Sequence, residues 1–234
     1  MKNISHADQQ KIWEEEHKNP YILLPMDSNE ASSGVSLFWD WLKAEGGAEN
    51  SRGIEMGCGK GRNSIWLAKQ DANMTSFDFS SIAIDEAQKR AVIAGVKKNV
   101  RFVVQDATKT WPFDNDSFDF AIDCFASTDI ESIDGRSFAR DEFLRVLKPG
   151  GYLLVYTLST DDEFHKEMLE KSPAQEKNAF LHPTTGKFEK VFDHEELMDF
   201  YNGWKVVEEK RIAKVAKFFG KDYNCKHFWN IFQK

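Results

Sequence analysis

The sequence predicts an α/β fold built on one mostly parallel sheet that is covered by helices on both faces. Two observations carry this prediction. From about residue 52 to 157, short apolar segments alternate with amphipathic ones, an order that implies right-handed crossovers and a parallel, doubly wound sheet. The chain has 234 residues, of which 41% are hydrophobic and 29% are charged. That composition fits one large folded domain and argues against disorder.

Strand and helix segments follow one another through the middle of the chain. Strands are expected where short apolar runs end in glycine, aspartate or polar turns, at residues 52–56, 74–79, 100–104, 118–123 and 152–156. Helices are expected where apolar residues recur at spacings of three and four, at residues 62–70, 81–94 and 135–147. Ser81 is expected to cap the second of these helices. Pro149 and the two glycines after it are expected to end the third.

Two flanking segments complete the expected fold. The first flank, residues 1–51, is expected to hold two helices, at about 5–18 and 34–45. The second flank is expected to hold helices near 161–171 and 193–201, an irregular insert near 172–192, and strands near 204–212 and 225–232. The two late strands raise the expected sheet to seven strands.

The charge balance and the cysteines exclude several classes of function. Lysine and arginine number 31 against 38 aspartate and glutamate, so the net charge is −7. A chain this acidic is not expected to bind nucleic acid in general. The three cysteines form no C-x-x-C pair, and the six histidines show no spacing typical of metal ligands. Neither a disulfide framework nor a metal site is therefore expected.

No segment has the character of a targeting signal or a membrane span. The first ten residues are polar and lack the apolar centre of a signal peptide. No run approaches the ~18 apolar residues that a membrane span needs. We therefore expect a cytoplasmic protein with reduced thiols and no membrane partner.

The most informative segment is the glycine-rich run from Glu55 to Asn63, which follows an expected strand and opens an expected helix. Glycines this close together allow a sharp turn and let a ligand approach the backbone. A dinucleotide fingerprint needs a glycine where Arg62 stands, so an NAD-dependent oxidoreductase is disfavoured. A P-loop fails as well, because Gly61 follows Lys60 where serine or threonine is required. The spacing E-x-G-x-G-x-G leaves space for a nucleoside without phosphate.

Together with four later elements, this loop resembles the class I S-adenosylmethionine-dependent methyltransferases. Asp78 ends the second expected strand, 23 residues after Glu55, and Gln105-Asp106-Ala107 follows the third. The run Trp111–Asp119 is similar to the family's L-P-F-x-D-x-S-F-D element. The run Phe143–Gly151 is similar to its R-V-L-K-P-G-G element. The resemblance covers about residues 50–157.

The resemblance implies a Rossmann-like, doubly wound sheet of seven strands, mostly parallel, with the last strand antiparallel. It implies a single domain over residues 1–234. Within it, residues 1–51 form an N-terminal helical cap, 52–157 the cofactor-binding core, and 158–234 a substrate-side insert with a C-terminal strand pair. The glycine loop is similar to the tellurite-resistance and thiopurine-type branches, whereas the Trp-Pro-Phe-Asp run is similar to the ubiquinone-biosynthesis-like branch. The two hints conflict, so neither selects a substrate.

The resemblance also assigns roles to residues. In this family the acid after the second strand binds both ribose hydroxyls, and the Asp-Ala pair after the third binds the adenine. The position after the fourth strand borders the transferred methyl group, which makes Asp123 the candidate catalytic residue. The residues expected to bind the cofactor are Glu55, Gly57, Cys58, Gly59, Asn63, Asp78, Phe79, Ser80, Asp106, Ala107, Asp123 and Cys124.

The implied reaction is methyl transfer from S-adenosylmethionine to a small-molecule acceptor by in-line displacement, with S-adenosylhomocysteine as product. Two alternatives stay open: methylation of a protein or peptide side chain, and cofactor binding without turnover. The acceptor itself is expected to lie between the two flanks, in a monomer or a homodimer. The candidates for its pocket are Trp13, Tyr21, Trp39, Phe125 and His182.

Overall fold

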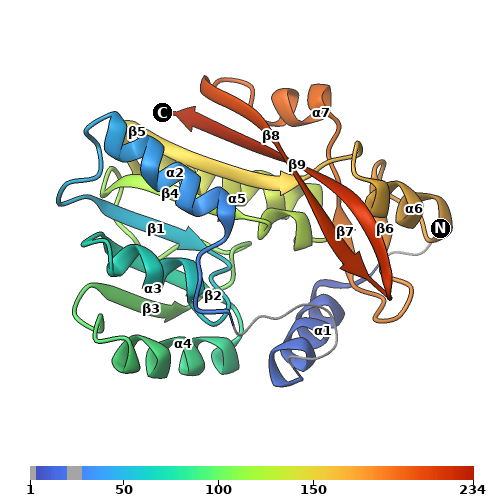
Figure 1. The fold of residues 1–234 in the computed structure, drawn as a ribbon, viewed down its shortest axis with the longest axis horizontal. Coiled ribbons are helices and arrows are strands. Elements are labelled where there is room, and N and C mark those ends of the chain that lie inside the picture. The colour runs from blue at the N-terminus through green and yellow to red at the C-terminus, as the bar shows by residue number, and fades with distance from the viewer. Residues whose placement is uncertain (1–3, 20–27) are drawn as a thin grey trace.

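The computed structural model describes residues 4–19 and 28–234, and its centre is a seven-stranded sheet in the order β3-β2-β1-β4-β5-β9-β8 (Figure 1). Strands β1 to β5 are parallel, and β9 runs antiparallel to both of its neighbours, β5 and β8. The predicted seven-stranded sheet with an antiparallel last strand is therefore confirmed. The strands are β1 (Arg52–Met56), β2 (Asn73–Asp78), β3 (Val100–Val104), β4 (Phe118–Cys124), β5 (Leu147–Leu158), β8 (Lys205–Phe218) and β9 (Lys221–Gln233).

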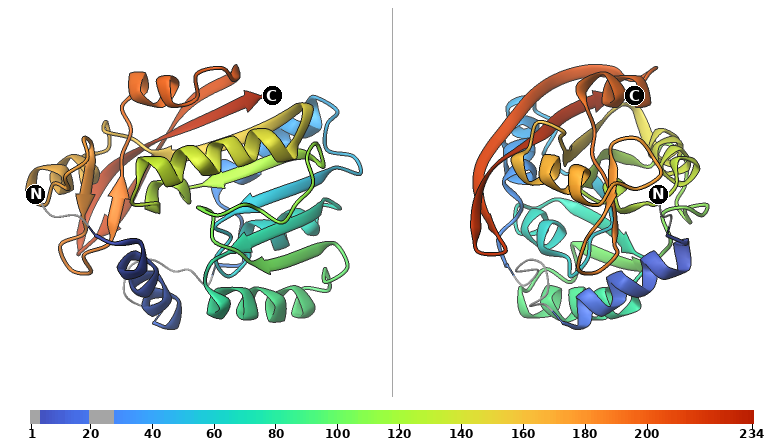
Figure 2. Two further views of the ribbon diagram at one scale, coloured as in Figure 1. Left: turned by 180° about the vertical axis from the view of Figure 1, so that it is seen from behind. Right: turned by 90° about the vertical axis from the view of Figure 1, so that its right-hand side faces the viewer.

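Helices cover both faces of this sheet, as the alternation of segments predicts. One apolar cluster joins one sheet face to α2 (Ser33–Ala44), α3 (Arg62–Ala68) and α4 (Ser81–Ile93). A second cluster joins the other face to α5 (Ile133–Val146) and α7 (His194–Phe200). Helix α2 lies in front of the sheet in Figure 1, and α5 lies in front in the reverse view of Figure 2.

The central strands alternate between these two clusters. On β4, Phe120 and Ile122 belong to the cluster under α2, α3 and α4, whereas Ala121 belongs to the cluster under α5 and α7. Successive side chains of a strand point to opposite faces, so Asp123 points toward α5 and α7 and Cys124 toward the other face. Cys124 accordingly packs against the first cluster.

Most element ends in the central part agree with the sequence prediction, and two exceptions there have local causes. The late strands β8 and β9 are longer than predicted and meet in a tight turn between Phe218 and Lys221. Helix α5 ends at Val146 and β5 begins at once with Leu147, three residues before the first glycine. Lys148 precedes a proline, which disfavours helical backbone there. The cap of α4 is Ser80 and not Ser81, because the Ser80 hydroxyl accepts a hydrogen bond from the backbone N–H of Ala83.

The second flank contains more regular structure than the sequence predicts. Residues expected to be irregular include the short antiparallel pair β6 (Ala179–Leu181) and β7 (Phe188–Lys190). Helix α6 (Glu163–Lys171) precedes this hairpin, and a separate apolar cluster joins α6 to β9. Three-residue strands carry too little periodicity to stand out in a sequence.

The first flank is not a single cap. Helix α2 is part of the helical layer on the sheet, and its Val35, Phe38, Trp39 and Leu42 are buried in the core. Helix α1 (His6–Lys18) lies apart from the sheet, below the strand ends in Figure 1. The two helices therefore have different neighbours, and only α1 is positioned to cover a site.

Candidate active site

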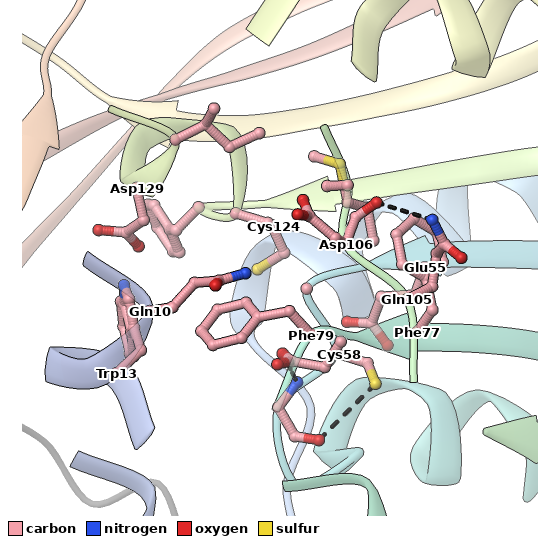
Figure 3. A pocket seen from close by; sticks show the side chains of 18 of the residues that line it. Gln10, Trp13, Glu55, Cys58, Phe77, Phe79, Gln105, Asp106, Cys124 and Asp129 are labelled. Atoms are coloured by element: carbon pink, nitrogen blue, oxygen red, sulfur yellow. Dashed lines mark hydrogen bonds between the residues drawn. The ribbon is translucent and has the colours of Figure 1, made fainter. Parts of the chain in front are cut away.

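A cavity of about 270 Å³ lies where the carboxyl ends of β1, β2, β3 and β4 meet, with α1 on its other side (Figure 3). Its lining comes from α1, the glycine loop after β1, the ends of β2 and β3, and the turn after β4. Ligands of open α/β sheets bind at this edge, because the crossovers leave a crevice there. The fold therefore places the candidate residues from separate motifs around one space.

The glycine loop turns sharply at the floor of the cavity. Gly57, Gly59 and Gly61 have left-handed backbone, with φ of 63°, 51° and 78°. A Cβ atom on Gly57 would lie 2.5 Å from the Cβ of Ala126, in the turn after β4. A side chain at that position is therefore excluded both by conformation and by space.

Asp78, at the end of β2, holds the glycine loop through a hydrogen bond to its backbone. Its carboxylate accepts hydrogen bonds of 2.9 Å from the backbone N–H of Gly59 and of Ser80. Burial raises the pKa of Asp78, while the nearby His17 and these two N–H groups oppose that shift. Asp78 lines the cavity, and each carboxylate oxygen can accept more than one hydrogen bond. It therefore holds the loop in place and still presents acceptor capacity to a ligand.

Glu55 and Asn63 are committed to the protein. The buried Glu55 carboxylate accepts hydrogen bonds from the Asn63 amide, at 2.8 Å, and from the Ser64 hydroxyl. Asn63 in turn accepts a 2.8 Å hydrogen bond from the backbone N–H of Ser32, just before α2. Burial raises the pKa of Glu55, and the Ser64 and Asn63 hydrogen bonds counteract this. Both residues reach the cavity wall, but their polar groups mainly tie the loop to two helices.

Asp106 and His6 face each other at the end of the cavity below β3. One Asp106 oxygen accepts 2.8 Å hydrogen bonds from the N–H and hydroxyl of Thr108. The other lies 2.9 Å from Nε2 of His6, whose Nδ1 lies 3.0 Å from Glu131. A histidine donates from both nitrogens only as imidazolium. Burial by itself would lower the pKa of His6, but the two carboxylates raise it above its ordinary value.

At the end of β4, the neighbouring candidates Asp123 and Cys124 point to opposite faces of the sheet. Cys124 lines the cavity, but burial raises the pKa of its thiol to about 11, so it stays neutral. Asp123 does not line the cavity. One of its oxygens accepts hydrogen bonds from the backbone N–H of Ala126 and Ser127, at 3.1 and 3.0 Å. Strand alternation turns Asp123 to the α5 and α7 face, where one oxygen fixes the turn and the other, Oδ2, is buried without a hydrogen-bond partner among the described residues. The expected place of Asp123 beside the methyl group stays a prediction.

Helix α1 is anchored over the cavity by buried polar contacts. The Gln9 amide donates to the backbone oxygens of Asp129 and Phe188, at 2.8 and 3.0 Å, and accepts from the N–H of Phe188 at 2.9 Å. The ammonium of Lys187 lies 4.3 Å from the centre of the Trp13 ring. These contacts join α1 to the β6–β7 hairpin and to the short 3₁₀ helix η1 (Ser127–Asp129). Helix α1, the hairpin and η1 are far apart in sequence but contact one another beside the cavity.

Known proteins share the central part of this chain. Residues 54–151 match a family model described as a methyltransferase domain. A demethylmenaquinone methyltransferase of Clavibacter sepedonicus is 36% identical over 107 residues, covering 46% of this chain and 41% of that protein. A fatty-acid O-methyltransferase of Mycolicibacterium smegmatis is 29% identical over 140 residues, covering 58% and 48%. This chain spans about half the length of the curated relatives it matches.

A solved structure extends the match beyond the central strands. It is a SAM-dependent methyltransferase from Methanosarcina mazei, 26% identical, with a TM-score of 0.69, and it covers 80% of this chain and 93% of its own. This chain contains a class I S-adenosylmethionine-dependent methyltransferase domain. The resemblance found in the glycine loop and the later motifs is thereby confirmed.

Most of the residues predicted for the cofactor lie together in this methyltransferase domain. The cavity is lined by ten of the twelve: Glu55, Gly57, Cys58, Gly59, Asn63, Asp78, Phe79, Asp106, Ala107 and Cys124. Asp123 and Ser80 do not line it. Ser80 is fully buried as the cap of α4. Whether the ten bind the cofactor stays a prediction.

The residues predicted for the acceptor divide differently. Trp13 and Phe125 line the cavity. Trp39 does not: it is buried against Phe120 under the sheet, with ring centres 6.0 Å apart, so its place in the acceptor pocket is corrected. His182 is buried beside Phe219 of the β8–β9 turn and does not line the cavity either. Tyr21 lies outside the described residues.

Several residues of the cavity were not predicted from the sequence. His6, Gln10 and His17 line it from α1, and Asp129 and Glu131 line it from the segment after β4. With Trp13, the three α1 residues are spaced by four, three and four, which is one face of a helix. That spacing was visible in the sequence. Nothing local distinguishes Asp129 and Glu131, since only the fold brings their segment over the strand ends.

Among residues 4–19 and 28–234, no group of three or more His, Cys, Asp or Glu side chains is arranged to hold a metal ion. Within the same residues, no helix has both the length and the apolar character that crossing a bilayer requires.

Proposed function

We propose that this chain binds S-adenosylmethionine in the cavity beneath α1 and transfers its methyl group to a small-molecule acceptor, releasing S-adenosylhomocysteine. The observation that carries the proposal is the placement of the glycine loop, Asp78 and Asp106 around one cavity. Left-handed glycines bring the loop backbone to the cavity wall, and the two carboxylates offer acceptors for ribose and adenine. These features fit the cofactor that the family uses.

The cofactor supplies a methyl group on a sulfonium, which is already strongly electrophilic. The residues of the chain therefore need to align the acceptor and keep water out. Asp78 and the loop backbone would hold the nucleoside and Asp106 the adenine edge. Trp13, Phe125 and Gln10 would border the acceptor from α1 and from the end of β4.

A small acceptor is favoured because α1 covers the cavity instead of leaving an open groove. Two relatives are named for small or lipid acceptors, demethylmenaquinone and a fatty acid, which supports the same class here. No specific observation favours the alternatives, a protein side chain or cofactor binding without turnover. The cytoplasmic location, the absence of a nucleic-acid partner and the choice between monomer and homodimer stay predictions.

Calorimetric titration with S-adenosylhomocysteine tests the proposal directly. We expect a dissociation constant near the micromolar range for the wild-type chain. Asp78→Ala should weaken binding by about 1.5–3 kcal/mol, as expected for the loss of a charged hydrogen-bonding partner. Asp85→Ala is the matched control, because Asp85 is an exposed aspartate of the neighbouring helix α4. No binding by the folded wild-type chain would reject the proposed function.

A further inference from the structure

Asp129 is one of two carboxylates that line the cavity from the segment after β4; the other, Glu131, contacts His6. It lines the same cavity as Cys124 and Phe125, which end β4 and follow it. One of its carboxylate oxygens, Oδ1, is buried and has no hydrogen-bond partner among the described residues. A buried acceptor without a partner is costly, so this oxygen is available for a donor that the protein does not supply.

The surroundings hold the carboxylate in place without satisfying it. The Lys187 ammonium lies 3.9 Å from Oδ1, too far for a hydrogen bond, and makes its closer contact, 2.9 Å, with Glu189. The backbone oxygen of Asp129 accepts the hydrogen bond from Gln9 of α1. Figure 3 shows Asp129 on the same side of the cavity as Trp13, while Gln10 reaches across. The position of Asp129 is thus set by α1 and the hairpin together.

The charges that face Asp129 come from three elements and from the loop between β6 and β7, which carries Lys187. Burial is the main cause that raises the pKa of Asp129 well above its ordinary value. Lys187 opposes that shift, whereas Glu189 on β7, Glu16 on α1 and Asp123 on β4 add to it. A carboxylate with a raised pKa accepts a proton more readily than one in water.

We propose that Asp129 accepts a proton from the methyl acceptor and thereby selects acceptors that carry an ionisable O–H or N–H group on an aromatic ring. The inference rests on the proposed function. The lone pair of the acceptor atom attacks the methyl carbon, the carbon–sulfur bond breaks with its electron pair leaving on sulfur, and the released proton passes to the Asp129 carboxylate. Trp13 and Phe125 supply flat apolar walls for such a ring.

The experiment offers the full chain radiolabelled S-adenosylmethionine and one of four bicyclic aromatic compounds as the methyl acceptor. They are 2-naphthol, a nitro-substituted 2-naphthol that is ionised at the assay pH, benzimidazole, and quinoline, which has no ionisable proton. We expect methyl transfer to the naphthols or to benzimidazole and none to quinoline. Transfer to quinoline alone, or to none of the four by a chain that binds S-adenosylhomocysteine, would overturn the inference and leave the proposed function standing.

Asp129→Asn distinguishes a proton acceptor from a residue that only maintains the fold. For 2-naphthol we expect kcat to fall by about 100-fold, the usual contribution of a positioned base. For the ionised naphthol the loss should stay below about tenfold, because no proton has to be removed. Equal losses for both would indicate a structural role and contradict the inference. Asp134→Asn, an exposed change at the start of α5, is the matched control and should lose nothing.

A binding measurement gives a second readout that needs no turnover. In the complex with S-adenosylhomocysteine, calorimetry should show 2-naphthol binding about tenfold more weakly to Asp129→Asn than to wild type, for the loss of a charged hydrogen-bond acceptor. The affinity for S-adenosylhomocysteine itself should stay within about twofold. If that affinity collapses as well, Asp129 maintains the cofactor site and the inference fails. If neither affinity changes, Asp129 does not contact the acceptor and the inference also fails.

Discussion

The two helices of the N-terminal flank each carry tryptophan but meet different surroundings. Helix α2 buries Val35, Phe38, Trp39 and Leu42 against the sheet. The buried residues of α1 are Gln9, Glu16 and His17, which are all polar. One helix is held by apolar contact with a preformed surface, and the other by hydrogen bonds and charge across a cavity.

This difference shows what an aromatic residue on a helix can and cannot indicate. The apolar face of α2 repeats at the helical period, which marks a helix that packs on a core. Trp13 on α1 is half-buried and meets the Lys187 ammonium on one side and the cavity on the other. Trp39, whose helix buries apolar residues, therefore belongs to the core. Trp13, whose helix buries polar residues, lines the cavity.

The largest expected effect comes from removing an apolar contact between α2 and the sheet. Trp39→Ala should lower the free energy of unfolding by about 3–5 kcal/mol, the usual cost of removing a large buried side chain. Trp13→Ala should cost clearly less, because its ring is only partly buried and has cavity on one side. Urea unfolding of the two variants measures the difference. Equal losses would mean that α1 packs as tightly as α2.

An intermediate effect is expected from the hydrogen bonds that anchor α1. Gln9→Ala removes three hydrogen bonds to Asp129 and Phe188, two of them fully buried, and should cost about 1–3 kcal/mol. Hydrogen exchange of the α1 amides should accelerate more than exchange in α2. Gln10→Ala is the matched control, since Gln10 lies next in sequence but reaches into the cavity, and it should leave both measurements nearly unchanged. An undisturbed α1 in Gln9→Ala would show that other contacts hold the helix.

The smallest expected effect is a pH-dependent one at His6. Because the pKa of His6 is raised in the folded chain, its contact with Asp106 and Glu131 contributes to the stability of the folded chain fully below about pH 6.5, the unperturbed value. The contribution disappears as the pH rises through the raised pKa. Proton NMR of the histidine rings should show His6 titrating above 6.5, and His182, whose pKa burial lowers, below it.

Two variants assign and sharpen the titration. The His6→Ala spectrum identifies the resonance by its loss. Glu131→Gln removes one of the two carboxylates and should move the His6 midpoint downward while leaving that of His182 in place. If Glu131→Gln leaves the titration midpoint of His6 unchanged, the contact between His6 of α1 and Glu131 after β4 is contradicted.

Much of the fold and of the cofactor side followed from the sequence, because the relevant signals are local. The glycine spacing, the acid after β2 and the Asp-Ala pair after β3 each lie within a few residues of a strand end. Parallel strands then bring those ends to one edge by the rules of the fold. Asp123 shows where local signals stop: it lies at the predicted strand end, yet the alternation of β4 turns it away from the cavity that Cys124 lines.

The proposed acceptor side of the cavity was decided by tertiary structure. Helix α1 and Asp129 after β4 are distant in sequence, and only their packing makes one wall of a cavity. Lys187 in the β6–β7 hairpin, more distant still, contacts both Trp13 and Asp129. By itself the sequence determined the parallel core of the sheet, the nucleoside loop and the family. Which flank residues face the cavity depended on long-range contacts between polar groups, and such contacts leave no periodic trace in a chain.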